Sequence, residues 1–498
     1  MVRHGEAVET RPDRFVEGAW DGDFATFDFD LAPHLVGSGG VLRDGACVFA
    51  SPFHPLEWLY VLQQPDQTFV SNSLVFLLQE AGDALDLSYP NYFFDLLRTA
   101  RYGLSRQPST TPTREGGHVE LYTACRLVID SDLRLRRTPQ PLGPPPANYS
   151  EYFDLLSTTS KRIVTNAADP ARATTYTPVA ACSRGYDSTA SAALAKMTGC
   201  TEGVTYARSG LPTGHPIRGF TKPLSDDSGT ECLQAMGMNV SEFDRVDALG
   251  FPGHPKAEFF YSLAATTDAS TLAMEGNLRG SVFFTGRHGE RYWGPTKRGK
   301  TKYYRETDDC NLSGRAASEF RLRVGFINFP APYIGALHGP ALLRITHSEE
   351  MRPWKLGVGY YDRPIARRLA EEAGVPRECF GHVKFGGGEE ACVLTETSER
   401  DFQGFLRSAV PEAIRRRMDP RPIVERDMSH HRLKYLRTNY SHWPLASPLL
   451  ELLQTDRLHK LWNSLYLYTF HWGFEKVRSS YVVAGHAKSG PESALHVA

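Results

Sequence analysis

The sequence predicts an α/β protein in two parts, an N-terminal α+β domain and a C-terminal domain built on a parallel sheet. After residue 149, short apolar runs alternate with helical patterns, which is typical of parallel β-α-β units. Before residue 140, short apolar runs follow one another with few helices between them. Five prolines within residues 138–146 favour an extended spacer between the two patterns. We therefore expect domains over residues 1–140 and 149–498.

The elements follow in order from apolar runs and turn residues. In the first domain we expect strands at 46–50, 58–62, 67–73, 118–122 and 126–129, and helices at 73–80 and 92–99. In the second we expect strands at 177–182, 203–207, 240–243 and 281–285, and helices at 149–165, 188–197, 229–236 and 258–267. Beyond residue 364 the chain is expected to be helical, at 366–373, 402–407 and 456–475.

The net charge, the cysteine spacing and the lack of long apolar runs argue against several classes of protein. The chain has 498 residues, and 56 basic side chains balance 57 acidic ones for a net charge of −1. A dedicated nucleic-acid binder is usually basic, so this balance argues against one. The eight cysteines contain no C-x-x-C pair, which argues against structural zinc and redox dithiols. The polar N-terminus and the lack of a long apolar run predict a cytoplasmic protein without a membrane span.

One segment carries the main chemical signal. Residues 183–189 join an expected buried strand to an expected helix start, where backbone N–H groups and the helix N-terminus can hold an anion. The glycine lets the backbone approach, the hydroxyls add donors, and Asp187 can hold Mg²⁺ against phosphate oxygens. An ordinary helix N-cap accounts for the same residue types. The segment reads Ser183, Arg184, Gly185, Tyr186, Asp187, Ser188, Thr189.

This segment resembles the S-G-G-x-D-S-[ST] loop of the PP-loop ATP pyrophosphatases, which cleave ATP between the α- and β-phosphates. Three further stretches are similar to the asparagine synthetase-like branch, which includes β-lactam synthetases and lasso-peptide cyclases. They are residues 285–294 (TGRHGERYWG), 382–386 (HVKFG) and 226–238, beginning with Asp226 and Asp227. The order and spacing agree over residues 150–400.

The resemblance implies ATP and Mg²⁺ as cofactors and assigns roles to individual residues. Asp187 and Glu290 would hold the metal, and Lys384 would act where charge develops during acyl-adenylate formation and amine attack. The nucleotide contacts would come from residues 183–189, from Val204 in the second strand and from Gly286. Other readings stay open at two positions. Glu290 can pair with the neighbouring Arg287 or Arg291, and Lys384 can be a solvated loop lysine.

Two positions depart from the family pattern. Arg184 stands where the family has its first glycine. If the backbone there has a positive φ, arginine is strained; if not, its guanidinium can bind phosphate. Glu290 replaces the usual aspartate and is one methylene longer. Both changes also fit a degenerate site.

The N-terminal domain resembles the late sheet of the family's glutaminase domain at residues 51–60 and 69–74. The family's catalytic cysteine follows the initiator methionine, whereas this chain has Val2, and Cys47 is the next cysteine. Valine supplies no nucleophile. The resemblance therefore implies a degenerate Ntn glutaminase-like domain with a structural role.

The leading prediction is an ATP-dependent ligase that adenylates a carboxylate and joins it to an amine or ammonia, releasing AMP and pyrophosphate. Its partners would be small-molecule acids and amines, with a peptide or natural-product intermediate among the options. A homo-oligomer is allowed, and no nucleic acid or membrane partner is expected. Adenylation-dependent sulfur transfer is an alternative, weakened by the lack of paired cysteines. A non-catalytic scaffold that keeps the fold is another. The basic run 297–305 and the aromatic residues Trp293, Phe326, Phe329 and Tyr333 are candidates for a loop and walls around a substrate.

Overall fold

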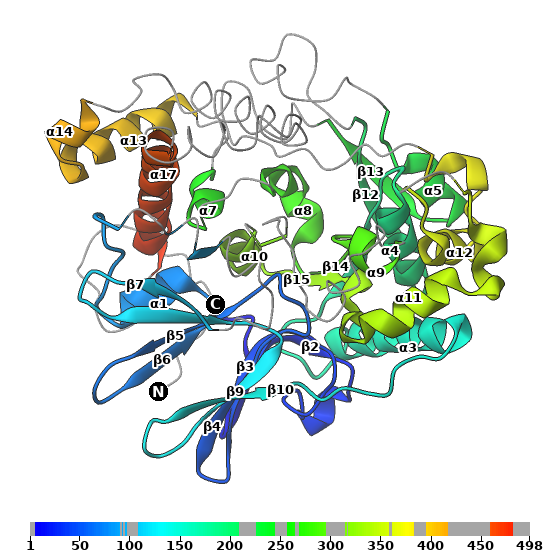
Figure 1. Ribbon diagram of the computed structural model, residues 1–498, viewed down its shortest axis with the longest axis horizontal. Coiled ribbons are helices and arrows are strands. Elements are labelled where there is room, and N and C mark those ends of the chain that lie inside the picture. The colour runs from blue at the N-terminus through cyan, green and yellow to red at the C-terminus, as the bar shows by residue number, and fades with distance from the viewer. Residues whose placement is uncertain are drawn as a thin grey trace, which may run out of the picture.

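The computed structural model shows a mixed α/β architecture with antiparallel strands at one side and a parallel sheet at the other (Figure 1). It describes residues 5–89, 92, 95–96, 108–208, 226–244, 256–263, 268–294, 314–315, 317–357, 361–382, 395–416 and 459–481. The α/β class expected from the sequence is thus confirmed.

The N-terminal region contains two antiparallel sheets. The first has the order β1-β2-β3-β4-β9-β10 and the second the order β6-β5-β8-β7. Their strands are β1 (Glu9–Arg11), β2 (Arg14–Trp20), β3 (Leu35–Arg43), β4 (Ala46–Ala50), β5 (Leu59–Gln63), β6 (Thr68–Ser71), β7 (Ser109–Pro112), β8 (His118–Tyr122), β9 (Cys125–Ile129) and β10 (Leu135–Pro139).

Strands β1, β2, β3, β7 and β10 were missed by the sequence analysis. Glycines explain the omission of β2 and β3, because they interrupt the alternation that marks a strand. Gly18 and Gly37 face each other across the two strands, with φ of 123° and 94°. A Cβ on Gly18 would lie 1.9 Å from the Val36 carbonyl oxygen, so only glycine fits this close approach.

The C-terminal region is organised around a five-stranded parallel sheet of order β13-β12-β11-β14-β15. Four of its strands were expected from the sequence, whereas the edge strand β15 was not. The residues of β14 and β15 are all buried, as expected for a parallel sheet covered on both faces. The strands are β11 (Thr177–Ala181), β12 (Glu202–Tyr206), β13 (Asn239–Phe243), β14 (Ser281–Thr285) and β15 (Ile327–Pro330).

Helices and short 3-10 turns surround the sheets. The helices are α1 (Leu74–Glu80), α3 (Tyr149–Ala167), α4 (Tyr186–Met197), α5 (Thr230–Ala235), α7 (Glu258–Tyr261), α8 (Glu275–Leu278), α9 (Gly289–Tyr292), α10 (Ser318–Val324), α11 (Gly339–His347), α12 (Pro364–Glu372), α13 (Glu396–Ala409), α14 (Glu412–Arg415) and α17 (His459–Ser480). The 3-10 turns are η1 (Phe24–Thr26), η4 (Ala269–Met274), η6 (Ala331–Tyr333), η7 (Ala336–His338), η8 (Glu349–Trp354) and η9 (Arg377–Cys379). The helix expected at 92–99 lies mostly outside the described residues.

Alternate side chains of the parallel strands enter two hydrophobic cores. Ala180 and Phe284 pack with helices α3, α4 and α12 on one face. Val179 and Phe283 pack on the other face with α7, α10 and α17 and with apolar residues of the N-terminal region. This alternation follows from the period of two along a strand. It places β11 and β14 at the centre of the C-terminal region, between both cores.

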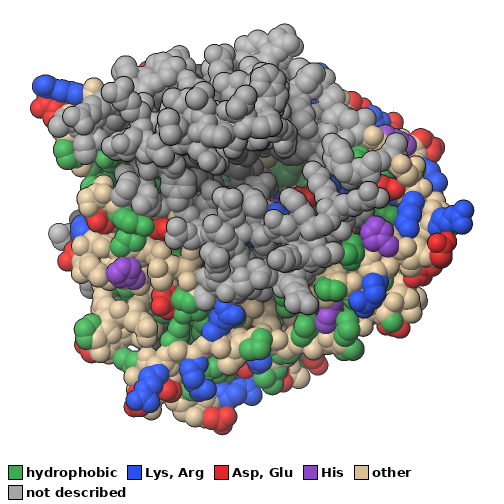
Figure 2. All heavy atoms as spheres, in the orientation of Figure 1, with side chains coloured by type: hydrophobic (Ala, Val, Ile, Leu, Met, Phe, Trp, Pro, Cys, Tyr) green, Lys and Arg blue, Asp and Glu red, His purple; other side chains and the backbone are tan. Residues whose placement is uncertain are grey.

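The expected proline spacer is partly built into the fold. β10 continues to Pro139, and the Gln140 side chain donates a hydrogen bond to the Ser51 carbonyl. Leu142 remains 55% exposed, and the following segment leads to α3. Within the described part of the chain, no helix has both the length and the apolar character needed to cross a membrane. Figure 2 shows acidic and basic side chains intermixed over the described part of one face.

Candidate functional site

The order of the parallel sheet marks one position as special. From β11 the chain proceeds to β12 on one side, whereas from β14 it proceeds to β15 on the other. At such a switch of direction, the carboxyl ends of the two central strands are where α/β proteins usually bind ligands. The loop 183–189 follows β11, and the loop 286–290 follows β14. The two loops singled out in the sequence therefore meet at the switch point.

The first loop is held by its own hydroxyl groups. The Oγ atoms of Ser183 and Ser188 lie 2.8 Å apart, and Ser183 Oγ accepts a hydrogen bond from the Gly185 N–H at 3.1 Å. The Thr189 hydroxyl donates to the carbonyls of Ser183 and Gly185, at 3.0 and 2.8 Å. Thr189 is fully buried, so its hydroxyl shapes the loop, whereas Ser183 and Ser188 remain partly exposed.

Helix α4 starts at Tyr186, two residues earlier than expected. Its N-cap is Gly185, which makes no side-chain capping bond, so the ordinary capping role of Ser or Asp does not apply here. The positive end of a 12-residue helix dipole therefore faces this loop. Tyr186 itself is fully buried, and its hydroxyl bonds to the Arg367 guanidinium. The structure thus places this predicted nucleotide contact in the core between α4 and α12.

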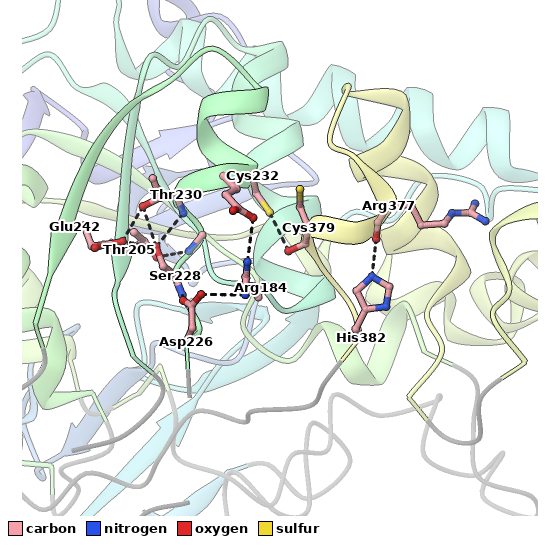
Figure 3. A network of polar contacts seen from close by, with 12 residues as sticks. Arg184, Thr205, Asp226, Ser228, Thr230, Cys232, Glu242, Arg377, Cys379 and His382 are labelled. Atoms are coloured by element: carbon pink, nitrogen blue, oxygen red, sulfur yellow. Dashed lines mark hydrogen bonds and ion pairs between the residues drawn. The ribbon is translucent and has the colours of Figure 1, made fainter. Parts of the chain in front are cut away.

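Arg184 adopts no left-handed backbone, so it is not strained in place of the family's glycine. Its guanidinium forms ion pairs of 3.0 Å with both Asp226 and Glu231 (Figure 3). Its carbonyl accepts a hydrogen bond from Gly381 N–H at 2.8 Å, and its N–H donates to the Asp227 carbonyl at 3.2 Å. Arg184 thus ties the loop to α5 and to the segment after η9.

An open cavity of about 580 Å³ lies beside Arg184 at the carboxyl ends of β12 and β13. Its polar lining includes Glu242, which accepts hydrogen bonds from the hydroxyls of Ser228 and Thr230 (Figure 3). Val204, a predicted nucleotide contact, is 1% exposed, and its carbonyl accepts the Cys182 N–H. Its side chain therefore belongs to the core. The cavity is lined by Arg184, Ala207, Arg208, Asp226, Ser228, Thr230, Glu231 and Glu242.

The second loop packs tightly on Asp187. A Cβ added to Gly286 would lie 2.2 Å from the Asp187 carbonyl carbon, and one on Gly289 would lie 2.5 Å from Asp187 Cγ. Both positions therefore require glycine. This contact brings Glu290, the residue after Gly289, to the neighbourhood of Asp187. Arg287, a sequence-based candidate partner of Glu290, forms its ion pair with the buried Asp268 at 2.6 Å.

Arg363 forms an ion pair with Asp187 and was missed by the sequence analysis. Its side chain is 6% exposed, and the charges of Asp187 and Glu290 both raise the pKa of Arg363 against the opposing effect of burial. The guanidinium carbon lies 5.4 Å from the Tyr361 ring centre. Burial, and next the charge of Asp187, raise the pKa of the Tyr361 hydroxyl. The available signal was Asp362-Arg363-Pro364, a charged pair ahead of a proline that starts a helix.

The protein groups at this site can bind Mg²⁺ only if phosphate oxygens complete its coordination. Among the residues that the structure describes, no three His, Cys, Asp or Glu side chains gather as a metal site. Mg²⁺ commonly binds through one or two carboxylates, water and substrate phosphates. Asp187 and Glu290 can supply the carboxylates, but Arg363 already engages Asp187.

The remaining sequence-based candidates are either outside the described part of the chain or in the core. Lys384 and the basic run 297–305 fall outside the described residues. Trp293 is fully buried and donates a hydrogen bond of 2.9 Å to the Tyr152 hydroxyl. Phe329 and Tyr333 are also buried. Phe326 is buried too, beside a small cavity of about 10 Å³. The aromatic residues proposed as substrate walls are therefore core residues.

Two cysteines lie close together at the first loop, although the sequence contains no C-x-x-C pair. Cys182 and Cys232 are both buried free thiols. Their interaction raises the pKa of Cys182 and lowers that of Cys232. The Cys232 thiol also donates to the Cys379 carbonyl at 3.7 Å (Figure 3). The sequence spacing hides this proximity because Cys182 directly follows β11 whereas Cys232 lies in α5.

A second buried polar group lies where the N-terminal region meets the parallel sheet. Arg321 pairs with Glu17 at 2.6 Å and with Glu57 at 3.2 Å. Burial lowers the pKa of the nearby His54 to about 3 and raises that of Glu57 to about 7. Val2 lies outside the described residues, and Cys47 is on the exposed side of β4.

Searches against protein-family models and against curated proteins find no match to this chain.

Proposed function

We propose that this protein is an ATP-dependent ligase that adenylates a carboxylate and forms a C–N bond with an amine or ammonia. AMP and pyrophosphate are the other products. The observation that carries the proposal is the meeting of the loops 183–189 and 286–290 at the switch point, with Gly286 and Gly289 packed on Asp187. A helix N-terminus, hydroxyl groups and two carboxylates near one another would suit a nucleoside triphosphate.

The chemistry assigns each group a task. The substrate carboxylate attacks the α-phosphorus, and negative charge grows on the phosphate oxygens as pyrophosphate leaves. The partly exposed Ser183 and Ser188 hydroxyls and the positive end of α4 would stabilise that charge. Mg²⁺ would neutralise phosphate charge, with Asp187 and Glu290 as its protein ligands. Lys384 keeps its proposed role from the family resemblance alone.

The nitrogen source is proposed to be a free amine or ammonia. This part of the proposal rests on the family resemblance alone. The N-terminal region would then serve the fold, and a homo-oligomer remains a prediction.

Exchange of labelled pyrophosphate into ATP, with candidate acids present, tests this proposal. We expect exchange with the wild type and a loss of about 100-fold or more in Asp187→Asn. Asp154→Asn is the matched control, because Asp154 is exposed on α3, and it should retain exchange. Release of ADP and phosphate, or full exchange in Asp187→Asn, would contradict the proposal.

One observation favours a non-catalytic scaffold as a second candidate. The acid proposed to bind metal is already neutralised by the buried Arg363. A scaffold of this kind need not bind nucleotide. Calorimetric titration with ATP and Mg²⁺ separates the two candidates, since tight binding that depends on Mg²⁺ favours the ligase.

A further inference from the structure

Arg363 is the cation at the meeting point of the two loops. It precedes Pro364, the first residue of α12, and its side chain is almost wholly buried. Taking a guanidinium out of water is costly unless an acid compensates it. Asp187 provides that compensation directly, and the charge of Glu290 contributes as well.

The charges of this cluster are unfavourable for a polyphosphate unless a cation faces it. Asp187 and Glu290 carry two negative charges, and Arg363 carries one positive charge. An arginine fork can bind two oxygens of a carboxylate or of a phosphate with the same geometry. Arg363 therefore has two possible acceptors of one chemical type, the Asp187 carboxylate and an incoming phosphate.

We propose that Arg363 binds the phosphate groups of a nucleoside triphosphate and holds Asp187 when no nucleotide is present. This inference rests on the proposed function and adds a recognition residue to the same site. On binding, the guanidinium exchanges Asp187 for phosphate oxygens, and the released carboxylate becomes available to the divalent ion. Asp187 and phosphate thus compete for Arg363.

Competition predicts effects of opposite sign for the two partners. Removing the guanidinium in Arg363→Met weakens pyrophosphate binding without Mg²⁺, by about tenfold for a lost charge-assisted contact. Removing the competing charge in Asp187→Asn strengthens the same binding severalfold. A pair with only a structural role would weaken binding, or leave it unchanged, in both variants.

Calorimetric titration with inorganic pyrophosphate in EDTA, and with ATP and Mg²⁺, measures these affinities. Arg368→Met is the matched control, because Arg368 lies on the same helix and pairs with Glu372 and Glu350 instead. It should bind both probes as the wild type does. Arg363→Lys, which keeps the charge but not the fork, should fall between wild type and Arg363→Met.

Binding of Mn²⁺ without nucleotide, followed by electron paramagnetic resonance, gives a second readout. Arg363→Met should bind Mn²⁺ at least about fivefold more tightly, because the Asp187 carboxylate is released. Unchanged pyrophosphate affinity in Arg363→Met, or weakened affinity in Asp187→Asn, would overturn this inference. If the wild type binds ATP in that case, the proposed function still stands. A wild type that binds neither ATP nor pyrophosphate overturns both. Asp187→Asn keeps the shape of the side chain, so it tests the inference even if Arg363→Met does not fold.

Discussion

Arg321 and Glu17 form an ion pair of two hydrogen bonds, at 2.6 and 3.0 Å, although 304 residues separate them in the chain. Arg321 is 4% exposed and comes from α10, whereas Glu17 comes from β2. Glu57 lies 3.2 Å from the same guanidinium. The N-terminal sheet and the region of the parallel sheet are therefore joined by a buried charge cluster.

We predict that Arg321→Met lowers the free energy of unfolding by about 3–5 kcal/mol, because two buried carboxylates lose their cation. Urea unfolding followed by circular dichroism measures this. Arg279→Met is the control: Arg279 is 64% exposed and pairs with Glu275, so its loss should cost less than about 0.5 kcal/mol. Equal losses in the two variants would show that the buried cluster contributes nothing to the free energy of unfolding.

Glu57 should make stability depend on pH. Burial raises the pKa of Glu57 from 4.5 to about 7, despite the opposing charge of Arg321. Between these values the folded protein holds a proton that the unfolded chain has lost, so the contribution of Glu57 to stability falls as the pH rises. Glu57→Gln removes this effect. Between pH 5 and pH 8, the free energy of unfolding of Glu57→Gln should rise by about 2–3 kcal/mol relative to that of the wild type.

The difference between variant and wild type is the quantity to measure, at several pH values. The contribution of His54 to stability changes with pH in the opposite direction. Burial lowers the pKa of His54 from 6.5 to about 3, so the folded state loses stability as the pH falls below 6.5. To the extent that the substitution leaves His54 unchanged, its contribution cancels in the difference. A pH-independent difference would mean that Glu57 titrates normally.

Gly286→Ala should disrupt the meeting of the two loops. The added methyl group would lie 2.2–2.3 Å from backbone atoms of Asp187 and Ser188, which cannot move without shifting the start of α4. We expect a loss of about 2–3 kcal/mol in the free energy of unfolding, together with loss of nucleotide binding. Gly276→Ala, at a position with open space around the added methyl, should preserve both. Wild-type melting and binding in Gly286→Ala would contradict the packing described.

A ligase of the proposed kind needs no thiol. Cys232→Ala should therefore keep pyrophosphate exchange within about threefold of the wild type, and it should lose about 1 kcal/mol of stability from the vacated core volume. Cys47→Ala on the exposed side of β4 is the control. Loss of activity in Cys232→Ala with normal melting would instead favour the sulfur-transfer alternative.

The alternation of strands and helices was predictable because buried parallel strands leave compact apolar runs, such as residues 281–285. The chain order of the two loops was also visible, since their glycines and acids have local chemical meaning. Their contact was implied only through the family resemblance, and the structure supplies it by steric fit between Gly286, Gly289 and Asp187.

Properties that arise from distant contacts were not predictable. Arg363 is one arginine among many until the fold brings it to Asp187. The Cys182–Cys232 contact joins two elements, and the burial of Tyr186 depends on α12. Local patterns identify what a residue can do, whereas tertiary packing decides which partner it meets.

The Ser73 hydroxyl caps α1 and donates to Glu319 at 2.8 Å, and Tyr481 donates to the same carboxylate at 2.6 Å. Helix α17, which leads to Tyr481, lies beside α1 in Figure 1. During synthesis on the ribosome, the first helix is made long before these partners emerge. The N-terminal region therefore cannot complete its packing during synthesis until translation has passed residue 481, so this part of the core forms late although its first helix is made early.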